Sequence, residues 1–423
     1  MTLNYNIKNF LNEIKSSSLL ENIFLIIPIL LVTGPFLPDL ALVTLTIVGL
    51  YKYKKKVFDQ ILEHKLILII LIFSIYNIFN SFLSEEFLVS FKSSITYLRF
   101  PLFAIIAGIL LANNKKIFQN FNLIITFLLF FLSIDAIFQF IFGVNLFGFE
   151  SIQKNRISGV FGEEYILGSY LSRLLPIYLF LNYINNNYNF NLNNISILLI
   201  ILVFIAVFIS GERTSLLILC SCILISFLLV RDKNYRVFLK KFFLIALSLT
   251  LIILVFSKDL RERYVYLTFG QLFDLNIGNL KKEDVRNQNL SHIKVSYSMF
   301  KDSFIRGYGN KMFGHKCFKD YFVNDGRCST HPHNFSAQIL VETGLIGFLI
   351  YLLFIIILIR EIIKNRNGLK YANIIILTLI LFNFFPLFPS GNFFNNWLNI
   401  LFYLPISFYI SVRNDFNNNI RNS

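Results

Sequence analysis

Long apolar runs separated by short polar connections dominate the chain. Of its 423 residues, 56% are hydrophobic and only 15% are charged, whereas a soluble globular domain carries about 25% charged residues. A core that buried so much apolar surface would leave too little polar surface to face water. The sequence therefore excludes a soluble enzyme and a disordered chain, and it predicts a polytopic membrane protein.

Twelve of the apolar runs are candidates for membrane-spanning helices, because such a helix needs about 20 mostly apolar residues. They lie near residues 19–36, 38–51, 66–83, 95–112, 121–142, 166–184, 195–210, 214–230, 242–257, 344–359, 372–388 and 394–412. The run at 38–51 is the weakest, since Pro35 and Pro38 interrupt the sequence before it, and a helical hairpin within the membrane would also fit. We predict an all-α fold with about 12 transmembrane helices and no strands.

Basic residues fall mainly on alternate connections of this twelve-span arrangement. The basic connections are 52–65, 115–116, 231–241 and 360–370. Because Lys and Arg are enriched on the cytoplasmic side of membrane proteins, we predict that these connections and both termini are cytoplasmic. The formal net charge of +15 is then mainly an orientation signal, and it gives no support to nucleic-acid binding.

The opposite face carries the longer polar connections. The sequence divides into residues 1–257 with nine spans, an outer loop at 258–343, and residues 344–423 with three spans and a cytoplasmic tail. Within the loop, apolar residues recur at spacings of 4, 3 and 4, at Ile293, Tyr297, Phe300 and Phe304. This spacing predicts an amphipathic helix that lies on the bilayer surface or against the spans.

Two cysteines of the outer loop, Cys317 and Cys328, flank a polar stretch. If that face is an oxidising periplasm, a disulfide between them is the natural interpretation. A metal site recruiting His315, His331 and His333 is the weaker alternative, because the spacing matches no common zinc pattern.

The end of the outer loop is rich in histidine. His331-Pro332-His333-Asn334 is followed by nine residues and then by Gly344-Leu345-Ile346-Gly347. Histidine is the side chain whose ordinary pKa suits proton transfer near neutral pH. These residues are candidates for acid–base chemistry, although a chance cluster in a polar loop would look the same.

Two other polar stretches interrupt the apolar runs. In Ser210–Ser215, Arg213 stands beside glycine at the membrane edge, where it suits an anionic ligand such as a lipid phosphate or simply extends toward the interface. The glycine-rich stretch 156–170 predicts either a cavity lining or a surface loop.

Asp135 and Gln139 lie one turn apart inside an apolar run. A charge there is costly unless it is paired or hydrated. Arg99 and Arg173 are the expected partners of Asp135, in an ion pair that is either structural or functional.

Together these features resemble the O-antigen ligase and O-antigen polymerase superfamily. The family signature is a His followed by Asn, Ser or Gln, nine residues, and Gly-x-x-Gly, which His333, Asn334, Gly344 and Gly347 match without gaps. The family also has an Arg in the outer turn between spans seven and eight, which Arg213 matches.

The resemblance extends over roughly residues 130–400. The loop 258–343 is similar to the family's long outer loop, and Ile305–Gly309 resembles its Gly-x-Gly turn after the amphipathic helix. The pattern of Asp, Gln, Arg and Gly within 135–159 also resembles the group. One departure is that many members carry an Arg where this chain has His292, with Arg286 a little upstream, so the residue that takes this role is open.

The resemblance implies a GT-C-like glycosyltransferase of the bacterial inner membrane with its active site on the periplasmic face. Such enzymes move a glycan from undecaprenyl diphosphate to a hydroxyl acceptor, which is a lipid A–core sugar in a ligase and another glycan chain in a polymerase. Membrane lipids and these two substrates are the expected partners. No cofactor and no metal are expected, since the outer face has no Asp-x-Asp or clustered carboxylates.

The reaction implied by the resemblance needs a base for the attacking hydroxyl and positive charge for the leaving diphosphate. We expect His333 to be the base, and Arg213 to be the first phosphate-binding residue. Weaker candidates for contacts with phosphate or glycan are Arg156, Arg306, Lys311, His292, Asn334 and Glu342. Asn334 could instead cap the following helix, and Glu342 could orient a histidine, pair with an Arg or be a solvated helix residue.

Two other functions remain open from the sequence. A polymerase of the same superfamily shares the fold and the His motif. A transporter or lipid flippase would also have many spans, but it predicts inverted repeats and a midplane site, and neither is apparent in the sequence.

Overall fold

The computed structural model describes residues 17–153, 155–190, 192–273, 288–318, 322, 328–364 and 371–421. Within these ranges the chain is all-α, as predicted, with no strand beyond two isolated bridges. The helices are α2 (Leu19–Leu30), α3 (Phe36–Glu63), α4 (Lys65–Ser81), α5 (Phe87–Tyr97), α6 (Arg99–Asn113), α7 (Lys116–Phe142), η1 (Gly159–Phe161), α8 (Leu167–Asn185), α9 (Asn194–Ile209), α10 (Arg213–Leu229), α11 (Lys233–Phe256), α12 (Lys258–Arg261), η2 (Glu262–Tyr266), α13 (Leu267–Phe273), α15 (Gln288–Asp302), α16 (Met312–Cys317), α18 (Phe335–Lys364), α19 (Tyr371–Asn383) and α20 (Asn396–Arg421).

The predicted polytopic membrane fold is confirmed. Among the described residues, five helical stretches are long and apolar enough to cross a membrane. They are Phe36–Glu63, Phe87–Asn113, Lys116–Phe142, Lys233–Phe256 and Phe335–Lys364. Further apolar helices are shorter, and each of the twelve predicted runs contains a helix. The number of spans, twelve, stays a prediction.

The weakest predicted span, 38–51, lies within a single helix. Helix α3 begins directly after Pro35 and continues to Glu63, with one non-helical residue at Tyr53. Pro38 lies in the first turn, where a helix does not need the missing N–H group. The basic stretch 52–56 therefore lies at a kink within α3 and not in a loop between helices.

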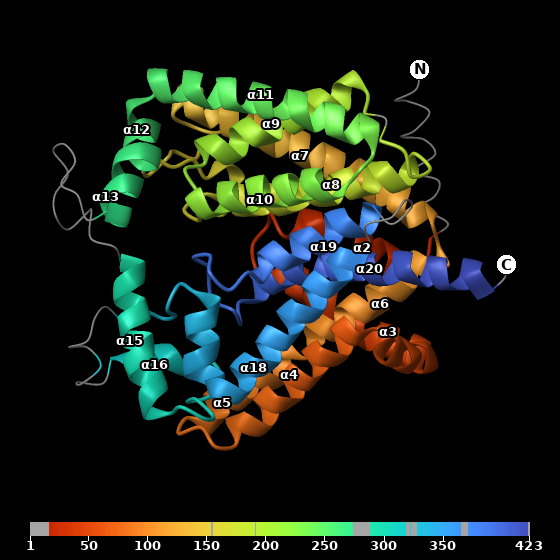
Figure 1. Cartoon of the computed structure of the whole chain (residues 1–423), viewed down its shortest axis with the longest axis vertical. Coiled ribbons are helices and arrows are strands. Elements are labelled where there is room, and N and C mark those ends of the chain that lie inside the picture. The colour runs from red at the N-terminus through yellow and green to blue at the C-terminus, as the bar shows by residue number, and fades with distance from the viewer. Residues whose placement is uncertain are drawn as a thin grey trace.

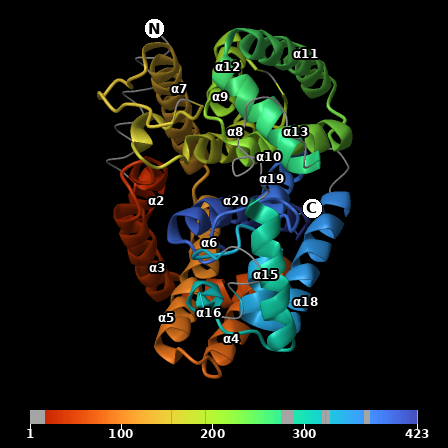
Figure 2. The ribbon, with the colours of Figure 1, turned by 90° about the vertical axis from the view of Figure 1, so that its left-hand side faces the viewer.

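Two groups of helices surround a central pair (Figure 1). Helices α7 to α11 form one group, while α3 to α6 and α18 form the other, and α19 and α20 run between them. Helix α20 packs on α6 and α19, and α8 packs on α7, α9 and α10. Helices α12, α13, α15 and α16 lie together at one side, which faces the viewer in Figure 2, and the chain ends at the other side.

Hydrogen bonds join residues that the charge pattern assigns to the same face. Among the predicted cytoplasmic residues, Asn114 donates to the carboxylate of Glu21 at 3.3 Å. Among the predicted outer residues, the hydroxyl of Ser84 donates to the carbonyl oxygen of Tyr308 at 2.8 Å. Which end is cytoplasmic rests on the charge argument.

Helix α18 is broken at Gly344, which has φ 64° and ψ −168°. The backbone of the turn after α15 fills the break. Leu345 N donates to Phe304 O at 2.9 Å, Tyr308 N to Val341 O at 3.0 Å, and Gly309 N to Glu342 O at 2.8 Å. The tenth predicted span was expected to begin at Gly344, but the helix begins at Phe335 and only changes direction at that glycine.

Two glycines make this backbone insertion possible. A Cβ atom on Gly344 would lie 2.4 Å from the carbonyl oxygen of Ile305. A Cβ atom on Gly307 would lie 2.6 Å from the backbone nitrogen of Gly344. Both glycines also have positive φ, which side chains disfavour. The Gly-x-Gly turn and the first glycine of the Gly-x-x-Gly motif are therefore two sides of one contact.

The amphipathic helix predicted in the outer loop is present as α15, but its packed face differs from the prediction. Ile293 and Tyr297 are exposed, whereas His292, Val295 and Met299 are buried and α15 packs on α18. The apolar spacing missed this face because it carries a histidine. The exposed face of α15 remains available to the bilayer surface.

We expect Gly344→Ala to destabilise the protein strongly, because positive φ costs about 1–2 kcal/mol and the clash with Ile305 O costs about 1–3 kcal/mol more. Gly148→Ala is the matched control, since Gly148 has φ +85° but no atom within 4 Å of the added Cβ. Thermal unfolding of the purified variants in detergent measures the difference. Equal melting temperatures for the two variants would contradict the importance of the backbone insertion.

Candidate functional site

Several predicted outer connections meet around one cavity of about 510 Å³. Polar and charged side chains from four parts of the chain line it: the segment 156–173, the α9–α10 turn with the start of α10, the loop before α18, and the segment between α19 and α20 with the end of α19. Its lining comprises Arg156, Glu164, Tyr165, Ile166, Ser169, Arg173, Glu212, Thr214, Ser215, Ile218, His331, His333, Phe335, Phe382, Asn383, Phe385, Phe388, Pro389, Ser390, Gly391, Leu398 and Phe402. The cavity thus has a charged part and an aromatic part.

His331 and His333 line the cavity together, and their ring centroids lie 4.1 Å apart. His333 has φ +54°, which is uncommon for a residue with a side chain. Its conformation is held from both sides. Ser390 N donates to its carbonyl oxygen at 2.9 Å, and the next residue, Asn334, caps α18 by accepting from Ala337 N at 3.0 Å.

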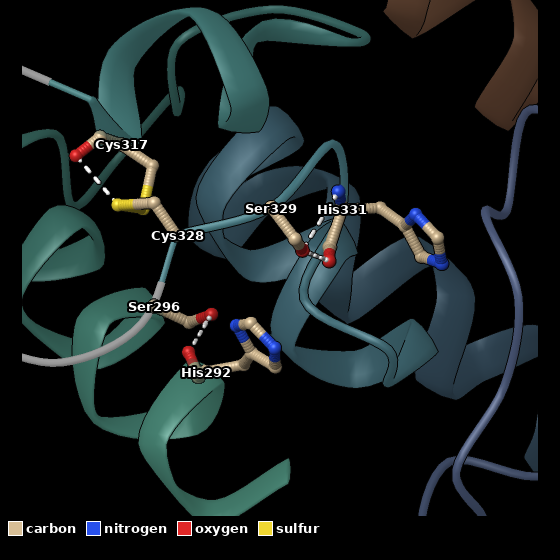
Figure 3. Close-up of a disulfide and its surroundings, with 6 residues drawn as sticks. All are labelled: His292, Ser296, Cys317, Cys328, Ser329 and His331. Carbon is tan, nitrogen blue, oxygen red and sulfur yellow. Dashed lines mark hydrogen bonds between the residues drawn. A yellow bond between two sulfur atoms is a disulfide. The ribbon is translucent and has the colours of Figure 1, made fainter. Parts of the chain in front are cut away.

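His292 completes a cluster of three histidines. It comes from α15, and its ring centroid lies 5.2 Å from that of His333. Figure 3 shows His292 and His331 on neighbouring elements. Of the two residues considered for the family's loop Arg, His292 is thus beside the signature histidine, while Arg286 lies outside the residues that the structure describes.

Burial keeps the histidines of the cavity uncharged near neutral pH. It lowers the pKa of His331 to about 4, and the electrostatic interactions with His333 and His292 act in the same direction. Burial and then His292 also lower the pKa of His333. Among the described residues, none bonds to the buried Nε2 of His331. Both imidazoles can therefore accept a proton.

A disulfide joins the histidine loop to α16 (Figure 3). Cys317 and Cys328 are bonded, with their Cα atoms 5.5 Å apart. Cys328 precedes His331 by three residues, so the bond restrains the loop near the histidines. His315 is exposed on α16, and within the described ranges no three His, Cys, Asp or Glu side chains are grouped so that they could hold a metal ion.

Two arginines supply positive charge to the cavity. The guanidinium of Arg156 donates to the carbonyl oxygen of Tyr165 at 3.2 Å and lies 4.3 Å from the centroid of its ring. Burial lowers the pKa of Arg156, and Glu212 opposes this shift. Arg173 donates to the carbonyl oxygen of Ser169 at 2.8 Å. Each arginine also has a buried Nε without a hydrogen-bond partner in the described structure. From the sequence, Arg173 was expected only as an ion-pair partner of Asp135.

Glu212 joins the α9–α10 turn to the start of α8. Its carboxylate accepts from Gly168 N at 2.7 Å, from Ser169 N at 3.0 Å and from the hydroxyl of Ser215 at 2.9 Å. Burial raises its pKa, which these hydrogen bonds and Arg156 oppose. From the sequence we chose the neighbouring Arg213 as a candidate site residue and did not choose Glu212. The start of α8 comes close to this turn at Gly168, where an added Cβ would lie 3.1 Å from the carboxylate of Glu212, a proximity that the sequence does not reveal.

Arg213 lies next to the cavity and is not part of its lining. Its two terminal nitrogens donate to Thr268 at 3.1 Å and to Gln271 at 2.9 Å, both on α13. Arg263, which the sequence analysis did not single out, donates to the carbonyl oxygen of Gly211 at 3.0 Å. These bonds hold the beginning of the outer segment on the α9–α10 turn.

The remaining predicted cations lie away from the cavity. Arg306 is exposed on the inserted turn, and Lys311 is exposed before α16. Glu342 is fully buried and accepts from Phe313 N and from the amide of Gln338, each at 3.2 Å. It is therefore not a solvated residue, and the bond from Phe313 ties α16 to α18.

The expected ion pair of Asp135 with an arginine is wrong. Arg99 pairs with Asp39 at 2.7 Å, and Arg173 bonds to Ser169 as described above. Asp135 instead accepts from the backbone of Leu146 at 3.0 Å and from the amide of Asn145 at 3.4 Å. A carboxylate can be satisfied by N–H groups of a loop as well as by a cation, and here Asp135 holds the loop after α7.

The buried histidine should make the protein less stable in acid. The unfolded chain takes up a proton on histidine near pH 6.5, whereas folded His331 does so only near pH 4. The unfolded state binds more protons between these values, so stability falls as the pH falls through this window. We expect His331→Gln to lose less thermal stability than the wild type between pH 7 and pH 5. His315→Gln, on an exposed site, should keep the wild-type dependence, and equal slopes for all three proteins would refute the assignment.

One protein family matches part of the chain. The family model described as O-Antigen ligase matches residues 198–352. This stretch includes most of α9, the outer segment and the first half of α18. It therefore contains Arg213, His292, His331 and His333. No curated protein matches the chain significantly.

Proposed function

We propose that the protein transfers a glycan from undecaprenyl diphosphate to a hydroxyl acceptor on the periplasmic face of the inner membrane, and the match of residues 198–352 to the O-antigen ligase family supports this. Members of this superfamily are glycosyltransferase-like enzymes. The acceptor we propose is a sugar of lipid A–core, which makes the protein an O-antigen ligase.

The cavity that holds both histidines and two arginines carries this proposal. Transfer needs a group that accepts a proton and groups that stabilise an anionic leaving group. His331 and His333 lie in the same cavity as Arg156 and Arg173, so both needs are met within one space. The aromatic part of the lining, with Phe382 and Phe388 stacked at 5.8 Å, suits an isoprenoid chain.

His333 is the proposed general base. The acceptor oxygen attacks the anomeric carbon of the donor sugar, its proton passes to His333, and the bond from that carbon to the diphosphate oxygen breaks. A base works best when its pKa is near the operating pH. His331, with a pKa of about 4, is the weaker base, and we assign it to orienting the acceptor or His333.

Arg156 and Arg173 are the proposed contacts of the leaving diphosphate. Arginine presents several N–H donors in a plane and forms paired hydrogen bonds with phosphate oxygens. Arg213 contributes by holding α13 over the α9–α10 turn, and it can also add positive charge near the phosphates. This assignment differs from the expectation from the sequence, in which Arg213 was the first phosphate-binding residue.

His333→Ala should reduce transfer by about 10²–10⁴-fold, the usual contribution of a positioned base. Arg156→Ala and Arg213→Ala should also abolish detectable transfer while the proteins insert normally. Lipopolysaccharide gels of a complemented deletion strain measure transfer, with immunoblots of the membranes as a check on insertion. His315→Ala is the matched control and should complement fully. Normal transfer by the His333 variant would rule out its role as base.

The lipopolysaccharide of the deletion strain tests the acceptor. Loss of every long chain from lipid A–core, with the lipid-linked glycan accumulating, is the result expected for a ligase. A single repeat unit left on the core would instead identify a polymerase of the same superfamily. Unchanged lipopolysaccharide would contradict both.

A further inference from the structure

A second cavity, of about 400 Å³, lies between α9 and α11. Its lining is mostly apolar and aromatic, with two lysines and one asparagine: Phe190, Leu192, Ile197, Ile201, Lys233, Asn234, Val237, Phe238, Lys241, Phe242 and Ile245. It lies at the beginning of both helices, whereas the end of α9 leads into the turn with Glu212. We refer to this second cavity as the groove. The groove and the candidate site are therefore at opposite ends of α9.

The charged and apolar side chains of the groove share one face of α11. Lys233, Val237, Lys241 and Ile245 follow one another at intervals of four residues, which places them in a row along a helix. The two lysines are separated by eight residues and hence by roughly 12 Å along the axis. The row brings two ammonium groups and an apolar wall to the same groove.

The protein itself leaves this face of α11 uncovered. Only 17% of the apolar window of α11 is buried, the smallest share among the five long apolar stretches. Val237 is 47% exposed and Ile245 is 38% exposed. Helices α9 and α11 lie side by side (Figure 1) and contact each other, but large side chains fill the space between them incompletely.

Within the part of the chain that the structure describes, no acid side chain lines the groove to neutralise the lysines. The nearest acid in sequence, Asp232, caps α11 by accepting from Tyr235 N at 2.8 Å. The other charged residues within 231–241 are basic: Arg231, Arg236 and Lys240. The groove therefore combines uncompensated positive charge with an apolar wall.

We propose that this groove binds a phospholipid with a net negative head group. The phosphate lies against Lys233 and Lys241, and an acyl chain lies between Ile197, Ile201 and Phe242. Basic pockets between transmembrane helices at the cytoplasmic end are suited to anionic lipids, and the lysines lie on a connection that the charge pattern assigns to the cytoplasm.

The chemistry of the groove favours a lipid over other occupants. A free phosphate ion would make no use of the apolar wall. A transmembrane helix of a partner would bury Lys233 and Lys241 in a low-dielectric contact, which is costly without an acidic partner. A phospholipid satisfies the cationic and the apolar parts at once. This inference does not depend on glycan transfer.

Native mass spectrometry of the full-length protein in detergent tests the proposal, with phosphatidylglycerol and phosphatidylethanolamine of equal chain length as probes. We expect the anionic lipid to bind more tightly. Lys233→Ala and Lys241→Ala should each weaken phosphatidylglycerol about fivefold, which corresponds to one lysine near a charged head group. Lys240→Ala is the matched control, since it removes an exposed lysine of the same turn that does not line the groove, and it should leave binding unchanged.

The variant Ile197→Trp distinguishes lipid binding inside the groove from attraction of the lipid to the surface charge alone. The larger side chain fills the space for the acyl chain and keeps both lysines, so binding of phosphatidylglycerol should fall. A size-exclusion profile and melting temperature like those of the wild type show that the variants are folded. Equal affinity for the two lipids, an equal loss with Lys240→Ala, or unchanged binding by the tryptophan variant would each overturn the proposal. Because the readout is lipid binding alone, these results do not depend on whether the protein transfers glycan.

Discussion

The insertion of the turn after α15 into the break of α18 determines the geometry of the candidate site. Backbone groups that lose their helical partners at Gly344 bond to Phe304, Tyr308 and Gly309 instead. In an apolar fold such groups cannot remain unsatisfied without a cost of several kcal/mol. One end of the inserted turn continues into α15 with His292, while the first part of α18 follows directly on His333. The contact therefore sets the position of one histidine relative to the other.

Buried carboxylates in this protein mainly serve backbone groups. Glu212 caps α8, Glu342 accepts from the start of α16, and Asp135 holds the loop after α7. Because these acids are occupied by N–H donors, they do not form tight ion pairs with Arg156 and Arg173. The arginines rest on carbonyl oxygens and aromatic rings instead. The cavity thus keeps positive charge that an anionic ligand can use, which an arrangement of closed ion pairs would have removed.

The sequence predicted the helical membrane fold, the amphipathic helix and the histidine motif, since each depends on local composition or spacing. It could not predict which polar groups meet across the fold. Asp135 and Arg173 were expected to pair because opposite charges in apolar runs usually do, yet loop N–H groups satisfied Asp135. The packed face of α15 was missed because His292 does not count as apolar. Gly344 matched the family spacing, but its role became visible only when the inserted turn was placed against it.

Helices α9 and α11 connect the two cavities. Helix α9 passes from the lysine groove to the turn that carries Glu212, and α11 passes from the groove to η2. There Arg263 bonds to Gly211 and Tyr264 donates to the carbonyl oxygen of Phe208. Hydrogen bonds thus join the end of α9 to the segment that follows α11, while the apolar contact between the beginnings of the two helices is incomplete. A ligand that fills the groove adds contacts where the pair has fewest, and it restrains the two helices whose ends position Glu212 and Arg213.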